Sequence, residues 1–119
     1  MTVRVPALLA SALGVLALSG CAARGPVYHW GHYEDLVYEM YVEPGKPEPG
    51  VQVEQLSRDI SEANARGDRV PPGVHLHLGY MYLLEGNAAA ARSEMETEKR
   101  LFPESTVFVD RLLARMSAP

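Results

Sequence analysis

Prolines and glycines divide the chain after residue 43 into short segments. "PGKPEPG" occupies residues 44–50, "VPPG" occupies residues 70–73, and Gly86 and Pro103 follow. Proline removes a backbone donor and clashes with the preceding helical turn, and glycine is entropically costly inside a helix, so regular elements end at these sites. The segments between them have the size of ordinary globular helices, roughly 8 to 20 residues.

Apolar residues recur within these segments at spacings of three and four. The stripes are Tyr33, Leu36, Val37, Met40 and Tyr41; Val53, Leu56, Ile60 and Ala63; Val74, Leu78, Met81 and Tyr82; Ala88, Ala91, Met95 and Phe102; and Val109, Leu112, Leu113 and Met116. This spacing places the members of each stripe on one face of an α-helix. We therefore predict an all-α fold of short antiparallel helical hairpins. The expected helices cover residues 33–41, 51–66, 72–85, 88–102 and 105–116.

The first twenty residues are different in kind. A short start that carries Arg4 precedes the apolar run "VPALLASALGVLALSG", which is typical of a secretory signal peptide and short for a membrane span. The run ends in "LSGC", which resembles the lipobox of bacterial lipoproteins. That resemblance implies cleavage after residue 20 and acylation of Cys21, which would leave a mature chain of 99 residues.

Cys21 is the chain's single cysteine, so an internal disulfide is excluded. We expect lipid rather than charge to attach the chain, because no polybasic patch follows Cys21 and more than one acyl chain anchors a protein firmly. Residue 22 is Ala rather than Asp, which by resemblance to enterobacterial sorting implies the outer membrane, facing the periplasm. Residues 21–32 would then form an acylated tether and an aromatic segment.

The aromatic segment and the helix after it, "YHWGHYEDLVYEMY", hold over half of the chain's Phe, Trp and Tyr residues. Tyr33 and Tyr41 lie on the apolar stripe, so we expect them in the core, where the helix would cover the open end of a small domain. Tyr28 and Trp30 precede the helix and are less constrained. Together with Tyr80 and Tyr82, we take them as candidate contacts for a protein partner.

Residues 72–105 span 34 positions, the length of a tetratricopeptide repeat. The residues that match that family's pattern are Leu78, Gly79, Tyr82, Gly86, Ala91 and Pro103. His75 and Glu98 depart from it, and Glu98 indicates that the next helix does not stack in the usual way. The resemblance implies a tetratricopeptide-like domain over residues 33–116, with residues 44–50 as a connector. Helix 51–66 would belong to a degenerate preceding repeat, and helix 105–116 would be a cap.

Charge and motifs exclude several classes of function. The net charge of −4 argues against a nucleic-acid partner. The chain has no nucleophile motif, zinc-protease motif or phosphate loop, so we expect no catalytic residues and no enzyme activity. His75 and His77 lie about 200° apart on a helix, so they cannot share a metal, and we expect no metal or other cofactor.

The mature chain as a whole resembles a family of short bacterial lipoproteins known only as a domain of unknown function. The stretches that carry the resemblance are "YHWGHYEDLVYEMY", "LGYMYLLEGN", "METEKRLFPES" and "FVDRLL". Members are often encoded beside a lipoprotein similar to the curli-secretion pore. The resemblance implies a non-catalytic adaptor or accessory subunit of a cell-envelope complex, with other envelope lipoproteins or a pore-like protein as partners. The alternative is a periplasmic protein that binds a metal or a cell-wall glycan.

Overall fold

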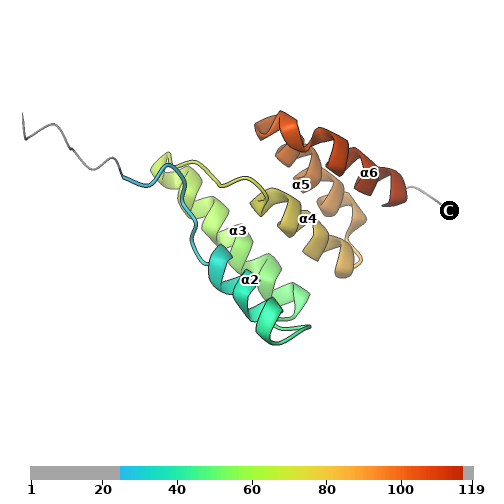
Figure 1. Ribbon diagram of the computed structural model, residues 1–119, viewed down its shortest axis with the longest axis horizontal. Coiled ribbons are helices and arrows are strands. Elements are labelled where there is room, and N and C mark those ends of the chain that lie inside the picture. The colour runs from blue at the N-terminus through green and yellow to red at the C-terminus, as the bar shows by residue number, and fades with distance from the viewer. Residues whose placement is uncertain (1–24, 117–119) are drawn as a thin grey trace, which may run out of the picture.

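The computed structural model describes residues 25–116, and the regular secondary structure in that range is entirely helical (Figure 1). The elements are α2 (Tyr33–Val42), α3 (Pro49–Arg66), α4 (Val74–Leu84), α5 (Ala88–Leu101), the 3-10 turn η1 (Pro103–Ser105) and α6 (Thr106–Met116). The predicted all-α class is confirmed for this part of the chain. The predicted signal peptide and Cys21 lie outside the described residues.

The helices form a row in which successive members alternate in direction (Figure 1). Helix α3 packs on α4, α4 on α5, and α5 on α6. Short turns make this arrangement possible: Gly67 closes α3 with φ 71°, and Asn87 begins α5 by accepting a hydrogen bond from the Ala90 N–H at 3.1 Å. Helix α4 begins at Val74, two residues later than expected, because Gly73 has a left-handed φ of 92°.

Two clusters make up the core. Leu36, Leu56, Val74 and Leu78 join α2, α3 and α4, and Tyr82 packs against them. The second cluster, Met95, Val109 and Leu113, joins α5 to α6. The predicted stripes of α3, α4 and α6 therefore point inward as expected.

Helix α2 departs from the expected packing. Leu36 is buried, whereas Val37 is 41 % exposed and Tyr41 is 84 % exposed. The prediction that Tyr41 lies in the core is wrong. Helix α2 lies at the end of the row, so only the narrow side that carries Tyr33 and Leu36 meets other helices.

Helices α4 and α5 meet closely at Gly79. A Cβ at this position would lie 2.9 Å from the Ala91 carbonyl oxygen and 2.9 Å from Met95 Cγ. Contacts as short as these would force the neighbouring atoms to move. The small residues Gly79 and Ala91, both part of the repeat pattern, thus let these two helices approach closely.

Glu98, the departure from the repeat pattern, is only 2 % exposed. Its Oε1 accepts a hydrogen bond of 2.7 Å from the Gly73 N–H, just before α4. Its Oε2 has no hydrogen-bond partner among the described residues. A carboxylate on α5 thus takes the place of a small residue and ties α5 to the turn that precedes α4.

Replacing Gly79 with Ala should destabilise the protein by about 1–3 kcal/mol, because the added methyl group forces α4 away from α5. The matched control is Gly50→Ala in the first turn of α3, where the nearest atom to a new Cβ is Glu85 Oε2 at 3.5 Å. That control should leave stability unchanged or raise it slightly. Urea unfolding followed by circular dichroism measures both, and equal midpoints for the two variants would contradict the close contact.

Candidate partner-binding groove

Three adjoining hollows cross α2, α4 and α6 on one side of the molecule. The central hollow is lined by Tyr33, Gly73, Leu76, His77, Tyr80, Phe108 and Leu112. It shares Tyr33 with a hollow along α2 and shares Tyr80 and Leu112 with one between α4 and α6. We call this continuous surface the aromatic groove.

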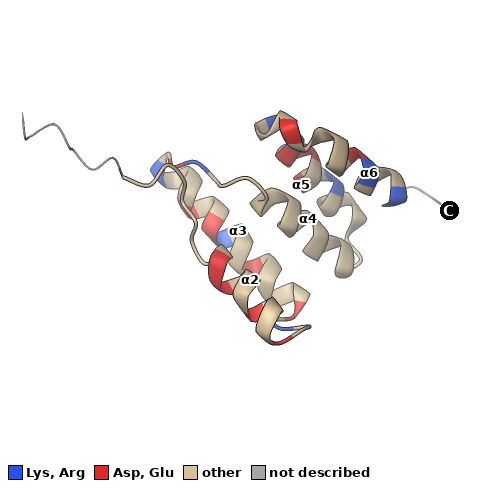
Figure 2. Cartoon of the chain, in the orientation of Figure 1, with Lys and Arg blue, Asp and Glu red and all other residues tan. Residues whose placement is uncertain are grey.

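The floor of the aromatic groove is α4, whose sequence "VHLHLGYMYLL" is apolar on nearly every side and carries no Lys, Arg, Asp or Glu (Figure 2). A helix that is hydrophobic all round is normally buried all round. In this protein the core uses the side with Val74 and Leu78, and the other side stays open. Tyr80 is 48 % exposed as a result.

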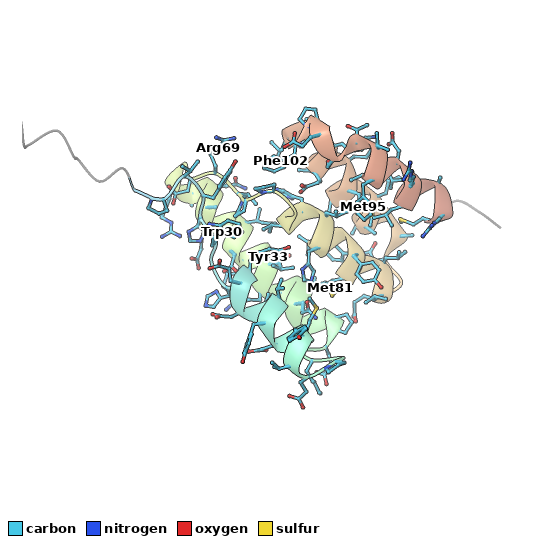
Figure 3. The ribbon with its side chains drawn as sticks, viewed as in Figure 1. Trp30, Tyr33, Arg69, Met81, Met95 and Phe102 are labelled. Atoms are coloured by element: carbon cyan, nitrogen blue, oxygen red, sulfur yellow. The ribbon has the colours of Figure 1, made fainter. Side chains whose placement is uncertain are left out.

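The aromatic segment forms one wall. Trp30 stacks on Tyr33 with ring centroids 6.2 Å apart, and Tyr28 meets Trp30 edge-on at 6.3 Å. The Arg69 guanidinium lies 5.1 Å from the centre of the Tyr28 ring, and Figure 3 shows Arg69 above the start of α2. Tyr33 in turn meets His77 of the groove floor edge-on at 5.6 Å. The rings therefore connect residues before α2 to α4.

A buried carboxylate holds this wall in place. Asp59 of α3 is 5 % exposed, and its Oδ2 accepts a hydrogen bond from the His32 backbone N–H at 2.7 Å. Its Oδ1 accepts one from Gln55 Nε2 at 3.3 Å and lies 3.0 Å from His32 Nδ1. Gly31 has a φ of 53°, and a Cβ there would lie 2.4 Å from Asp59 Cγ. Only glycine therefore allows the chain to pass so close to Asp59.

Charge and burial shift the pKa values at this contact. The hydrogen bond to Asp59 and its negative charge raise the pKa of the His32 ring above 6.5. Burial alone raises the pKa of Asp59, but the hydrogen bonds from the His32 backbone and ring and from Gln55 outweigh it, so the pKa lies below 3.8. The two groups therefore form an ion pair in mildly acidic solution.

The remaining histidines have protein partners. His75 Nδ1 lies 2.7 Å from Glu94 Oε2, and His77 Nε2 lies 2.8 Å from Gln52 Oε1. His29 contacts Arg66, which is itself cationic. Within residues 25–116 the structure contains no group of three His, Cys, Asp or Glu side chains that could hold a metal ion.

The structure places the four candidate contact residues differently. Trp30 and Tyr80 line the groove, and Tyr28 is half-buried at its edge under Arg69. Tyr82 lies on the opposite side of α4, packed against the core cluster of Leu36 and its neighbours, because two residues advance a helix by about 200°.

Sequence reasoning missed the α6 side of the groove. Phe108 is 57 % exposed although it is a large aromatic residue. It stands just off the apolar stripe of its helix, beside the buried Val109. A large apolar residue outside the stripe is the signal that could have found it.

The family model described as "Domain of unknown function (DUF4810)" matches residues 27–112, which include α2 to α5 and the first part of α6. The chain belongs to this family. No curated protein and no solved structure matches it. Every residue that lines the central hollow of the groove lies inside the matched region. No helix in the described range is long and apolar enough to cross a membrane.

The contact between His32 and Asp59 should make the packing of α2 depend on pH. His32 has a raised pKa, so its contribution is complete below pH 6.5 and is lost as pH rises through the folded-state value. Asp59 has a lowered pKa, so its contribution is present above pH 3.8 and is lost as pH falls. Hydrogen exchange in α2, corrected for intrinsic rates, should therefore be faster at pH 8 than at pH 6.

An NMR titration of the His32 ring tests the cause directly. The fitted pKa should exceed 6.5 in the native chain and return toward that value in the Asp59→Asn variant. A native pKa at or below 6.5, or an α2 exchange rate that does not change between pH 6 and 8, would contradict the ion pair.

Proposed function

We propose that the chain is an outer-membrane-anchored lipoprotein that acts as a non-catalytic adaptor or accessory subunit of a cell-envelope complex. Its aromatic groove would hold a segment of another envelope protein. The observation that carries this proposal is the exposure of Trp30, Tyr80 and Phe108, at 39 %, 48 % and 57 %, along one continuous apolar surface. Large exposed aromatic residues dominate the binding energy of protein interfaces.

The close packing of the helices beneath the groove also favours a partner-binding function. The contact at Gly79 fixes α4 against α5, and Asp59 fixes the start of α2 against α3. A groove on a firmly packed scaffold loses little entropy when a partner binds. Hairpin α4–α5 also coincides with residues 72–105, the segment that resembles a tetratricopeptide repeat, and repeats of that kind use the concave side of stacked helices to bind peptides.

The proposed anchor places the groove close to a membrane. Only residues 22–27 separate Cys21 from Tyr28. A fully extended chain of that length spans roughly 20–25 Å. A partner in the same membrane would then meet the groove at a high effective concentration.

A second candidate function is the binding of a small ligand. The stacked rings of Trp30 and Tyr33 favour a cell-wall glycan, since sugar rings pack on exposed aromatic faces. Calorimetry with wall fragments, zinc and copper tests this candidate. Heat from a wall fragment that disappears in Trp30→Ala would support it, and no heat from any of them would remove it.

A double substitution, Trp30→Ala with Tyr80→Ala, should abolish partner capture. Each change removes an aromatic contact from the groove, and losses at such sites typically exceed about 1 kcal/mol each. Cells that express the tagged chain would be cross-linked, the envelope solubilised, and the captured proteins quantified by mass spectrometry.

The matched control is Leu101→Ala, which removes a side chain that is 48 % exposed on α5, outside the groove. This variant should capture the partner as the native chain does. If the double variant folds and retains every envelope partner, the groove is not the binding surface.

A Cys21→Ala variant should fail to incorporate labelled palmitate and should leave the outer-membrane fraction. The cysteine thiol and the new amino terminus carry the acyl chains in the lipoproteins that this segment resembles. Metabolic labelling followed by membrane fractionation measures both effects. Equal labelling of the native chain and the variant would contradict the anchor.

A further inference from the structure

The two ends of the helix row both expose apolar side chains. Helix α2 presents Tyr38 and Tyr41, which are 65 % and 84 % exposed, and α6 presents Val107 and Phe108, which are 64 % and 57 % exposed. The outer helices of a stacked array normally carry a polar outer face, because an apolar one invites further stacking. Within residues 25–116 neither end of the row is wholly polar, since each mixes exposed apolar and charged side chains.

The same two edges carry opposite charges. Glu34 and Asp35 are exposed in the first turn of α2, and residues 27–45 contain no Lys or Arg. Arg111 and Arg115 are exposed on α6, and Figure 2 shows blue segments on this helix. These four charged side chains form no ion pair with another side chain within residues 25–116. By contrast, Asp110 on another side of α6 is paired with Lys99 of α5 at 2.5 Å.

The order of these groups along each helix is complementary. Helix α2 has its acidic residues first and its exposed apolar residues about a turn and a half later. Helix α6 has its exposed apolar residues first and its arginines about a turn and a half later. With a rise of about 1.5 Å per residue, both separations are near 8 Å. Antiparallel alignment of the two edges would bring apolar side chains together and place each arginine beside an acid.

We propose that a second copy of this chain docks here, with the α6 edge of one copy lying antiparallel against the α2 edge of the next. Tyr38 and Tyr41 would pack against Val107 and Phe108, and Glu34 and Asp35 would pair with Arg111 and Arg115. Opposite charges at close range select this pairing over a pairing of like edges. Because the two edges differ, the contact is head-to-tail and gives each copy two neighbours, in a closed ring or an open row.

Two features favour a second copy over an unrelated protein. Both complementary edges belong to the same chain, so each copy supplies the whole match. The edges lie at opposite ends of the row, so one copy can use both at once (Figure 1). The contact uses side chains on the walls of the aromatic groove, namely Glu34, Tyr38, Tyr41, Phe108 and Arg115, and leaves Tyr80 and Leu76 on its floor open. It is tested by cross-linking between two copies, so its outcome does not depend on the proposed partner-binding function.

Cysteine cross-linking of the full chain tests the proposal. One copy carries Tyr38→Cys and a first tag, and a co-expressed copy carries Val107→Cys and a second tag. A short bismaleimide added to the opened cells should give a product that contains both tags. A copy with Leu101→Cys, exposed on α5, replaces the Val107→Cys copy as the control, and it also reports any background from Cys21.

Charge exchange tests the specific pairing. Adding Glu34→Arg and Asp35→Arg to the first copy should reduce the product to the level of the Leu101→Cys control. Adding Arg111→Glu and Arg115→Glu to the second copy as well should restore it, which also shows that the changed chains are folded. The amount of native cross-linked product should also fall clearly at about 1 M salt, because the screening length there is near 3 Å.

Three outcomes overturn the proposal. The first is a two-tag product no more abundant than the control. The second is a product of two Tyr38→Cys copies or of two Val107→Cys copies that matches the mixed one, since this would mean that like edges meet. The third is a mixed product that does not fall when the charges of one edge are reversed, or that falls and is not restored when both edges are exchanged.

Discussion

The close contact between Gly79 and Ala91 is the constraint on which the rest of the structure depends. A side chain at position 79 would collide with the Ala91 carbonyl oxygen and with Met95 Cγ, so glycine there lets α4 lie against α5. Helix α4 then contacts α3 on one side through Leu78, and α5 contacts α6 on the other through Met95. Every other packing contact in the row is made on a surface of this hairpin or on a helix that it supports.

The groove follows from the composition of α4. This helix has more apolar surface than α3 and α5 can cover, because its residues are apolar on nearly every side. The uncovered part becomes the groove floor, and α2 and α6 add Tyr33 and Phe108 as walls. An exposed apolar surface of this kind is costly in water, which is the physical reason to expect that a partner covers it.

Asp59 holds the residues before α2 by polar contacts rather than by apolar packing. The residues before α2 contain little aliphatic surface, and they are held by polar bonds to one buried carboxylate and by the stacked rings of Trp30 and Tyr33. This attachment connects the segment nearest the proposed lipid anchor to the wall of the groove. A pull on the tether would therefore act on α2 before it acted on the α4–α5 hairpin.

The sequence by itself determined the helices. Residues spaced three and four apart, with prolines and glycines between the segments, predict helices α2 to α6 with small errors at their ends. These features are local, since they depend on backbone geometry and on neighbours one turn away.

Tertiary structure alone decided which side of each apolar helix is covered. Tyr41 and Tyr82 both lie on predicted stripes, but Tyr82 has α2 and α3 beside it, whereas no helix of residues 25–116 covers Tyr41. Burial depends on the number of neighbouring helices, and that number is set by the position of a helix in the row. For the same reason Asp59 and Glu98, which read as surface charges in a helical pattern, are buried where another part of the chain offers a backbone N–H.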